Sequence, residues 1–453
     1  MKTLILDGFN ESSAVQQKVM DAVTGELDSR GWETRVLAPR NMDLRPCKGC
    51  FGCWTIRPGR CLQNDDGDLL CRRIMDSELF LIVSPVTFGG YSSSAKIALD
   101  RLICLISPFF RMVRGEVHHR PRYERVPAMA ALGIGLGESD ACKEIFETLH
   151  YRNAVNFHPP SAAVEVLQRK DLTDAGVAGV REGIARLLEE AAVSRFSDQP
   201  GRKVREDQFS AEPGCSLDVR SDKGASRRVL IMIGSPRKRS TSSAMGEELS
   251  VHFRDLGWQV EKAGISEKFG DPEGLRSLTE AAGGADLVVL LCPLYVDSLP
   301  APVTAALETL AAARCENVSR RRQGFMAVLN CGFPESFHNY TALAIARQFA
   351  REAGLTWMGG LFLGMGGAID GKTLKERGGM VRNLRKALRL TAEALDRGQP
   401  VPSEAADLMA KPFLPRWMYL TIGNWAWKRQ AAKNGVRGQL HAQPYRSGNR
   451  RKI

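Results

Sequence analysis

Short runs of apolar residues alternate along the chain with longer stretches in which apolar positions recur at helical spacing. The runs 79–83 and 287–292 are apolar at every position, which is typical of strands buried on both faces of a parallel sheet. Right-handed connections between parallel strands then predict doubly wound α/β domains. Because such sheets bind ligands beyond the carboxyl ends of their strands, we expect the chemistry in the loops that follow these runs.

The pattern occurs twice, in the same order. The matches pair residues 4–8 with 230–234, the run ending at Pro85 with the run ending at Pro293, and residues 129–135 with 326–332. A unit this long is a duplicated domain and not a solenoid repeat. We therefore predict α/β domains over 1–195 and 227–410, a linker over 196–226, and a basic aromatic helix and tail over 411–453.

Composition adds few constraints. Hydrophobic residues make up 43% and charged residues 25% of the 453 positions, which are ordinary globular values. The net charge is +12, but residues 411–453 hold ten Lys or Arg and no acid, which leaves 12 − 10 = +2 for the rest. This argues against a nucleic-acid-binding surface on the domains. The N-terminus turns polar at Asp7, too early for a secretory signal, so we expect a strand there and a cytoplasmic protein.

A candidate anion site follows the first strand of the second copy. The segment reads Gly-Ser-Pro-Arg-Lys-Arg-Ser-Thr-Ser-Ser over 234–243. Hydroxyl groups and backbone N–H groups at a helix N-terminus bind anions, and Arg237 adds positive charge, so the segment suits a terminal phosphate. It lacks the Walker and dinucleotide glycine patterns, so neither ATP nor a Rossmann site is indicated. If Ser240 to Ser243 merely capped a helix, Arg237 would remain unexplained.

Three loops of the second copy resemble those of a known family. The loop 234–237 resembles the FMN-phosphate loop of the flavodoxin-like NADPH-dependent FMN reductases, 293–298 resembles their loop along the isoalloxazine ring, and 331–335 resembles a third flavin-side loop. The resemblance covers most of residues 1–400 and implies two tandem flavodoxin-like domains, each a doubly wound parallel sheet. It implies an FMN site in the second copy made by Ser235, Arg237, Lys238, Ser240, Thr241, Ser242, Ser243, Pro293, Leu294, Tyr295, Val296, Ser298, Gly332, Phe333 and Pro334.

The first copy departs from this pattern. Its loop 8–13 has no arginine and contains Glu11, whose charge repels phosphate. Its ring loop, 84–90, keeps the family shape but has Thr87 where an aromatic residue is common. The resemblance implies a second flavin site here, made by Gly8, Asn10, Ser12, Ser13, Pro85, Val86, Thr87, Phe88 and Gly89. The alternative is a degenerate copy retained for its packing.

Four of the eleven cysteines are bunched in an insertion of the first copy, as C-x2-C-x2-C-x7-C. Three thiolates at this spacing can face one cubane, and a fourth closes it, whereas zinc more often uses two separated pairs. The spacing resembles the cluster motif of the iron–sulfur flavoproteins, a branch of the same superfamily. It predicts a [4Fe–4S] cluster at Cys47, Cys50, Cys53 and Cys61. Zinc and redox-active thiols remain alternatives, and Cys71 is a fifth candidate ligand.

Two further segments carry expectations. A second insertion, between Leu102 and Met129, is basic and contains His118 and His119, and we interpret it as a solvated loop over the flavin mouth. In the tail, Phe413, Trp417, Leu420 and Trp427 share one helical face. We expect this face to pack against the protein, and membrane-surface contact is the less favoured alternative. The closing segment 450–452 is expected to be disordered.

Together these features predict a flavin-dependent NAD(P)H oxidoreductase that passes electrons to a small-molecule or protein acceptor, singly if the [4Fe–4S] cluster is present. We identify no catalytic nucleophile or general base. The alternatives are a cluster-free reductase of free flavin, quinones or nitro compounds, and a non-enzymatic electron carrier or docking module. The resemblance also implies a dimeric arrangement, as in the related reductases. We therefore expect either that the two copies form a pseudo-dimer within one chain or that the chain forms a homo-oligomer.

Overall fold

The computed structural model describes residues 1–135, 139–168, 176–193, 195–198, 201–212, 215–216, 226–316 and 322–446. The chain divides into two compact units. Unit 1 contains Met1–Lys203 together with Trp417–Ile453, and unit 2 contains Val204–Arg416. The predicted disorder at 450–452 lies outside the described residues. No helix of the described part is long and apolar enough to cross a membrane.

The strands of unit 1 are β1 (Lys2–Asp7), β2 (Glu33–Leu37), β3 (Leu79–Thr87), β4 (Gly90–Tyr91), β5 (Ile106–Val113), β6 (Glu116–Pro121), β7 (Ala128–Ile134) and β8 (Ala162–Leu167). Its helices are α1 (Ala14–Ser29), α2 (Gly52–Thr55), α3 (Gly67–Met75), α4 (Ser93–Arg101), α5 (Asp140–Phe157) and α6 (Gly176–Val193). The helix α13 (Arg416–Lys433) lies almost entirely in unit 1.

Unit 2 contains strands β9 (Arg228–Ile233), β10 (Gln259–Gly264), β11 (Leu287–Pro293), β12 (Gly324–Asn330) and β13 (Thr356–Leu363). Its helices are α7 (Thr241–Asp255), α8 (Pro272–Gly284), α9 (Ala301–Glu316), α10 (Tyr340–Glu352), α11 (Arg382–Asp396) and α12 (Ser403–Ala410).

Both units contain the same parallel sheet. The strand order is β2-β1-β3-β7-β8 in unit 1 and β10-β9-β11-β12-β13 in unit 2, with all these neighbours parallel. Counted along each unit, this is the 2-1-3-4-5 order of flavodoxin-like sheets. The predicted fold class, two tandem flavodoxin-like domains, is confirmed.

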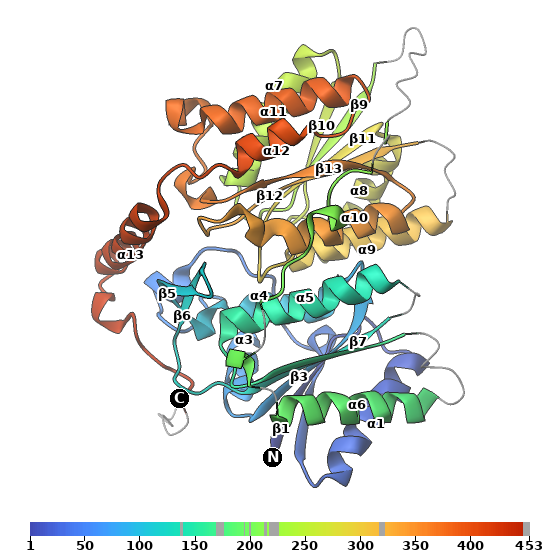
Figure 1. The fold of residues 1–453 in the computed structure, drawn as a ribbon, viewed down its shortest axis with the longest axis vertical. Helices are drawn as coiled ribbons and strands as arrows, with labels where there is room; N and C mark the ends of the chain where they lie inside the picture. The colour runs from blue at the N-terminus through green and yellow to red at the C-terminus, as the bar shows by residue number, and fades with distance from the viewer. Residues whose placement is uncertain are drawn as a thin grey trace. The chain divides into compact units, whose positions relative to one another are not determined.

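Helices cover both faces of each sheet (Figure 1). In unit 1, alternate strand residues such as Ile5 and Leu81 pack against α1 and α6, and α5 lies on the opposite face. In unit 2, α7, α11 and α12 cover one face, and α9 and α10 cover the other. Since both faces are buried, the central strands are apolar at nearly every position, which is the pattern visible in the sequence.

The insertion between Leu102 and Met129 is an antiparallel hairpin of β5 and β6, so the prediction of a solvated loop was wrong. His118 lies on β6 with no exposed surface. Its Nε2 is 3.2 Å from Glu116 Oε2 and its Nδ1 is 3.0 Å from Asn156 Oδ1. Because these polar partners satisfy the ring, the histidine can be buried at low cost.

The two ends of the segment predicted as a linker are packed, one on each unit. The Phe196 ring lies 5.4 Å from the Tyr151 ring of unit 1, between ring centroids. The Phe209 ring lies 4.4 Å from the Tyr340 ring of unit 2. Much of the segment between Pro213 and Ala225 lies outside the described residues.

Candidate functional site

Three loops meet at the carboxyl edge of the unit 2 sheet, because they leave the ends of the neighbouring parallel strands β9, β11 and β12. They are the predicted phosphate loop at 234–240, the ring loop at 293–298 and the third loop at 331–335. This is the edge at which flavodoxin-like sheets bind their ligands. The structure thus brings the fifteen predicted site residues of the second copy to one edge of one sheet.

The phosphate loop ends in an N-capped helix. Ser240 has extended backbone, and its Oγ accepts a hydrogen bond of 3.1 Å from the N–H of Ser243. The two hydroxyls also bond each other at 2.7 Å. The Thr241 hydroxyl donates to the Gly366 carbonyl at 2.7 Å. Capping therefore does occur, and the positive dipole end of α7 is directed at this edge.

Positive charge stands beside this helix end. Arg237 and Lys238 are exposed, while Ser235 is half-buried and its Oγ accepts from the N–H of Arg237 at 3.3 Å. Gly234, where the loop leaves β9, has no room for a side chain, since a Cβ there would lie 2.4 Å from Val303 Cγ2. Close backbone packing and flanking cations are the properties of an anion cradle.

Asn330, which sequence reasoning missed, ties the three loops together. Its Nδ2 donates to Ser242 Oγ at 2.9 Å and to the Cys292 carbonyl at 3.1 Å, and its own carbonyl accepts from the N–H of Leu294 at 2.8 Å. Because the Ser242 hydroxyl accepts this bond, it keeps its own hydrogen to donate. The signal in the sequence was a lone polar residue at the end of an apolar strand.

The ring loop is a tight turn in strained backbone. Tyr295 and Ser298 exchange backbone hydrogen bonds of 2.9 and 3.1 Å, and the two residues between them, Val296 and Asp297, have φ of 50° and 54°. A β-branched residue in the left-handed region is an outlier, and such outliers cluster at functional sites. Pro293, Leu294, Tyr295 and Val296 are half-buried, and Asp297 and Ser298 are buried.

The third loop carries a buried histidine between carboxylates. His338 Nε2 lies 3.5 Å from Glu335 Oε2 and its Nδ1 lies 4.0 Å from Asp297 Oδ1. Its ring centroid lies 4.5 Å from that of Phe333, with the two rings tilted by 34°. Arg416 Nε lies 3.0 Å from Glu335 Oε1. Burial raises the pKa of Glu335, but the hydrogen bond and charge of His338 and the charge of Arg416 outweigh it, so this pKa is lowered.

The remaining residues of the third loop differ in exposure. Gly332 is exposed, Phe333 is half-buried and Pro334 is buried. The Phe333 carbonyl accepts from the N–H of Met365 at 2.7 Å. Gly364 must be a glycine because a Cβ there would lie 2.5 Å from the Pro334 carbonyl oxygen. The loop is thereby fixed to the end of β13.

Unit 1 keeps the helix cap of unit 2 but has a buried carboxylate at the end of its first strand. Ser13 caps α1 with φ −145° and ψ 164°, against −146° and 164° for Ser240. Asp7, at the place of Ile233, is buried and accepts from the N–H of Phe9 at 3.2 Å, Gln16 Nε2 at 2.7 Å and Arg40 Nη2 at 2.8 Å. Donors that could hold a phosphate are therefore engaged by the protein.

The other predicted residues of the first copy also serve internal contacts. The Asn10 side chain accepts from the N–H of Ser94 at 3.1 Å, and a Cβ on Gly8 would lie 2.7 Å from Ala95 Cβ. Ser12 is exposed. The ring loop repeats the unit 2 turn, since Phe88 and Gly89 have φ of 54° and 81° between the paired residues Thr87 and Gly90. Pro85, Val86 and Thr87 are half-buried and Phe88 is buried.

The cysteine loop curls between its ligand candidates. Gly49, between Cys47 and Cys50, and Phe51, between Cys50 and Cys53, have φ of 59° and 55°, so the chain reverses its curvature at each interval. Cys50 is exposed, Cys47 and Cys61 are half-buried and Cys53 is buried. Burial raises the pKa of the Cys47 thiol to about 12, and the negative charge of Cys61 adds to this shift. Burial likewise raises the pKa of Cys53, and the charges of Cys47, Cys61 and Cys50 add to it.

An aromatic layer lies beneath this loop. Trp54 is buried, and its indole N–H donates to the Ile103 and Ile106 carbonyls at 3.1 and 3.2 Å. The Trp54 ring lies 5.1 Å from Phe51 and 5.2 Å from Trp427 of α13. Gly52 packs directly on Leu62, because a Cβ would lie 2.2 Å from Leu62 Cδ1. The cysteine loop is thus seated on a rigid apolar base that includes the tail.

Cys71, the fifth candidate ligand, faces Cys104, and the two sulfur atoms lie 3.3 Å apart in the interior. Of the other scattered cysteines, Cys292 and Cys331 are buried as expected, whereas Cys142 and Cys215 are half-buried and Cys315 is exposed. The latter three do not behave as small core hydrophobes.

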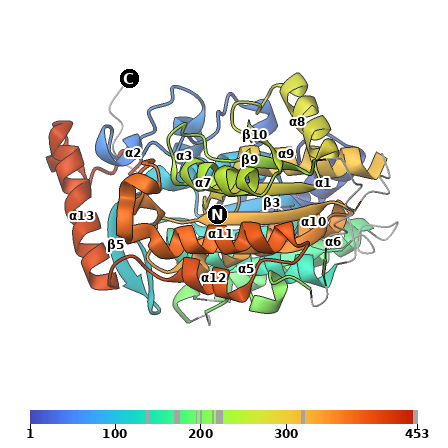
Figure 2. The same ribbon diagram turned by 90° about the horizontal axis from the view of Figure 1, so that it is seen from above.

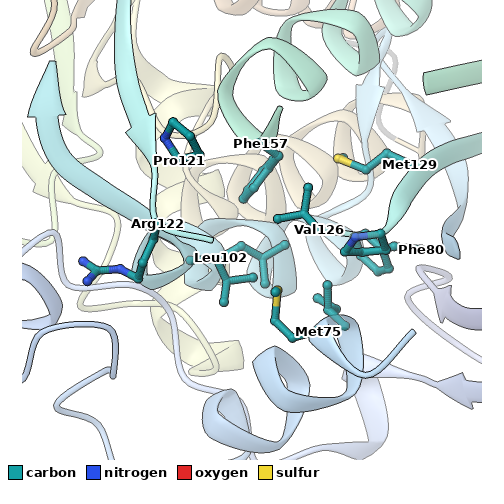
Figure 3. Close-up of a pocket in the computed structure, with 11 residues that line it drawn as sticks. Met75, Phe80, Leu102, Pro121, Arg122, Val126, Met129 and Phe157 are labelled. Carbon is teal, nitrogen blue, oxygen red and sulfur yellow. The ribbon is translucent and has the colours of Figure 1, made fainter. Parts of the chain in front are cut away.

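An apolar pocket of unit 1 lies at the wrong end of the sheet for a cofactor of this fold. Phe80 and Met129, near the amino ends of β3 and β7, line it with Leu102, Val126 and Phe157, and Arg122 is its one charged lining residue (Figure 3). Ligands of doubly wound sheets bind at the carboxyl ends. The pocket is therefore not the predicted flavin site.

Comparison with known proteins places this site in a family. The sequence profile of the family described as NADPH-dependent FMN reductase matches residues 1–166 and 227–332, which is more than half of the chain and includes both copies. An iron–sulfur flavoprotein of Archaeoglobus fulgidus is 29% identical over 110 residues, which cover 23% of this chain and 55% of that protein. An iron–sulfur flavoprotein of Methanosarcina thermophila is 26% identical over 105 residues, covering 23% and 54%. The matched segment thus spans about half the length of these relatives.

Solved structures give weaker likenesses. A putative quinone reductase from Klebsiella pneumoniae aligns with a TM-score of 0.34 at 14% identity, covering 42% of this chain and 86% of that one. An NAD(P)H:quinone oxidoreductase from Methanothermobacter marburgensis aligns with a TM-score of 0.28 at 16% identity, covering 38% and 96%. From the profile match over both copies, the chain belongs to the NADPH-dependent FMN reductase family.

Proposed function

We propose that the protein binds one FMN at the carboxyl edge of the unit 2 sheet, holds a [4Fe–4S] cluster on the cysteine loop of unit 1, and uses NAD(P)H to reduce a one-electron acceptor. The observation that carries the proposal is that the two copies carry different candidate binding residues. Unit 2 has a capped helix end flanked by the exposed Arg237 and Lys238, whereas unit 1 has no cation in its loop 8–13, the buried Asp7 at the end of its first strand, and the four cysteines in an insertion.

The residues of unit 2 fit FMN. The first turn of α7, the Ser242 hydroxyl and the flanking Arg237 and Lys238 would hold the phosphate. The ring loop around Tyr295 and Val296 and the third loop at Phe333 would line the isoalloxazine. The bound flavin supplies hydride acceptance and one-electron release. The protein supplies a rigid frame, in which Asn330 fixes the distance between the helix end and both ring-side loops.

The cysteine loop fits an iron–sulfur cluster better than zinc. In the described chain, no three of its sulfur atoms lie within 4.8 Å of one another, whereas Zn–S bonds of ~2.3 Å in a tetrahedron bring thiolates to about 3.8 Å. The thiols of Cys47 and Cys53 are costly to ionise where they are buried. A cation that neutralises four thiolates removes this cost, and its binding releases protons. Such a cluster supplies single-electron steps.

The test is an anaerobic absorption spectrum with flavin and iron counted per chain. The unchanged protein is expected to hold one FMN and about four irons, with a broad absorbance that dithionite bleaches. Cys50→Ser is expected to lose iron and keep flavin, and Arg237→Ala is expected to lose flavin and keep iron. Cys315→Ser and Arg276→Ala serve as controls, because both residues are exposed and lie away from the three loops.

The outcomes separate the alternatives. Flavin without iron leaves a cluster-free reductase, and rapid NAD(P)H oxidation with a quinone or nitro compound would then identify it. Flavin and iron without NAD(P)H oxidation would make the protein an electron carrier. Two flavins per chain would contradict the role of Asp7, and a chain without either chromophore after reconstitution would contradict the proposal as a whole.

A further inference from the structure

Helix α13 docks on unit 1 through its small and polar residues. Asn424 Oδ1 accepts a hydrogen bond of 3.0 Å from the N–H of Phe110 on β5, and Gly423 lies on the Phe110 ring, where a Cβ would be 2.8 Å from Cε2. Ala431 is fully buried against Phe109 and Leu440. Figures 1 and 2 both show α13 running beside β5. Two aromatic residues of the helix also contact unit 1: Trp427 packs on Trp54, and the Tyr419 ring lies 6.1 Å from the Phe110 ring.

The opposite face of α13 exposes large apolar side chains. Trp417 is 67% exposed, Trp425 57% and Ile422 48%, while the other five tryptophans of the chain are buried or half-buried. At 3.6 residues per turn these three side chains fall within an arc of about 140°, directed away from the inner face. The prediction that Trp417 and Trp427 share one packed face was therefore wrong. A helix that only covers a core buries its large apolar side chains and exposes its polar ones, whereas α13 does the reverse.

Cations surround this ridge. Arg429 and Lys433 are exposed on this helix, and the Arg429 guanidinium lies 5.2 Å from the Trp425 ring centroid, whereas Lys428 Nζ lies 5.8 Å from the Phe109 ring of unit 1. Residues 411–453 contain ten Lys or Arg and no Asp or Glu, while the remainder of the chain is near neutral. Most of the net positive charge of the chain thus lies on the segment that carries the exposed tryptophans.

We propose that the outer face of α13 docks the protein on an anionic lipid bilayer. A convex ridge of tryptophan and isoleucine flanked by lysine and arginine matches the interfacial region of a membrane, where the indole rings lie at the headgroups and the cations meet lipid phosphates. An acidic protein surface would also complement the charge, and the absence of vesicle binding in the test below would favour it. The helix lies in the plane of the interface and leaves the inner-face contacts intact.

The test uses the full-length holoprotein and vesicles of phosphatidylcholine with or without 30 mol% phosphatidylglycerol. We expect co-sedimentation with the anionic vesicles, a blue shift of tryptophan fluorescence, and binding that weakens as salt screens the charges. Trp417→Ala/Trp425→Ala and Arg429→Glu/Lys433→Glu are each expected to lower the partition coefficient at least tenfold. Met112→Ser, an exposed apolar position on β5, is the control and is expected to bind as the unchanged protein does.

Three results would overturn the proposal. One is an absence of binding to anionic vesicles at low salt. Another is equal binding by the double tryptophan variant, when its circular dichroism and flavin content match those of the unchanged protein. The third is a concentration-dependent dimer, seen by light scattering, that the tryptophan changes abolish while vesicles bind nothing. That result would assign the ridge to a second copy of the chain. Since none of these readouts depends on NAD(P)H turnover, failure here leaves the proposed oxidoreductase function intact.

Discussion

Asn330 and Ser242 are 88 residues apart in the sequence, yet the Asn330 side-chain amide donates a hydrogen bond of 2.9 Å to the Ser242 hydroxyl. The same amide nitrogen donates to the Cys292 carbonyl. One buried side chain therefore fixes the start of α7 against the ends of β11 and β12. Since those three points bear the three loops of the candidate site, this residue ties their relative geometry together.

Replacing Asn330 with leucine is expected to weaken FMN binding about tenfold or more. The change leaves the Cys292 carbonyl without its side-chain donor in a buried place, which costs about 1–3 kcal/mol, and it frees the first turn of α7. The dissociation constant follows from the quenching of flavin fluorescence. Ser250→Ala is the control, because Ser250 is buried in the same helix but bonds only the Gly246 carbonyl within it. Equal losses in both variants would contradict the role of Asn330.

Gly89→Ala is expected to destabilise unit 1 by more than Gly115→Ala. Both glycines have φ of 81°, so both changes incur the same cost of a left-handed alanine, about 1 kcal/mol. At Gly89 a Cβ would also lie 2.8 Å from Ile145 Cβ, whereas nothing lies within 4 Å at Gly115. The difference is expected to be about 1–3 kcal/mol, the usual cost of overpacking. Urea unfolding of the two variants measures it, and equal midpoints would show that α5 yields at this contact.

Ala431→Arg is expected to release the tail from unit 1. Ala431 is fully buried between Phe109 and Leu440, while its neighbour Ala432 is exposed. Burying an unpaired charge costs several kcal/mol, so the helix undocks instead. Limited proteolysis followed by mass spectrometry is expected to cut the variant near residues 411–446, whereas Ala432→Arg, with the same change of charge, stays protected. Protection of both would mean that the inner face of α13 tolerates an arginine.

Unit 1 is expected to lose stability as the pH falls from about 6.5 to 4. Burial lowers the pKa of His150, and also of His158, from 6.5 to about 4. In that interval the unfolded chain binds protons that the folded unit does not, so stability is complete above pH 6.5 and declines below it. For His150 the loss is up to roughly 3 kcal/mol. Urea midpoints at pH 7, 5.5 and 4.5 measure the slope, which His150→Gln is expected to reduce, and an unchanged slope would rule His150 out as a source.

The sheets could be predicted from sequence because burial on both faces leaves a local signature. Runs such as 79–83 and 287–292 need no knowledge of their neighbours to be read as central strands. That the three predicted loops lie at one edge followed from the same rule, since the ends of parallel strands share an edge. Long-range polar pairing leaves no such signature. Asp7 is visible as an acid in an apolar strand, but its partner Arg40 lies 33 residues further on.

The hairpin of β5 and β6 and the orientation of α13 failed for different reasons. The charged residues of the hairpin made its sequence look like a solvated loop. In the structure Arg114-Gly115 is the turn between the two strands, and charged residues are paired inside the unit, as Glu116 is with Arg152 at 2.5 Å. Helical periodicity grouped Trp417 with Trp427 on one face, but Trp427 packs on Trp54 whereas Trp417 is exposed. The inner face is chosen by Gly423 and Asn424, whose fit to Phe110 depends on tertiary structure.

The contact of the tail with the cysteine loop also orders events during synthesis. Asn434 Nδ2 donates to the Thr55 carbonyl, Pro444 seats on Gly59, and the Tyr445 hydroxyl donates to Asp68, so unit 1 is completed by residues that are translated after all of unit 2. At ordinary elongation rates this delay is roughly 10 to 50 s. During that time the cysteine loop lacks its contacts with the tail, and a chain that ends prematurely after unit 2 never forms them. Only a chain that includes the tail can therefore complete the packing around the cysteine loop.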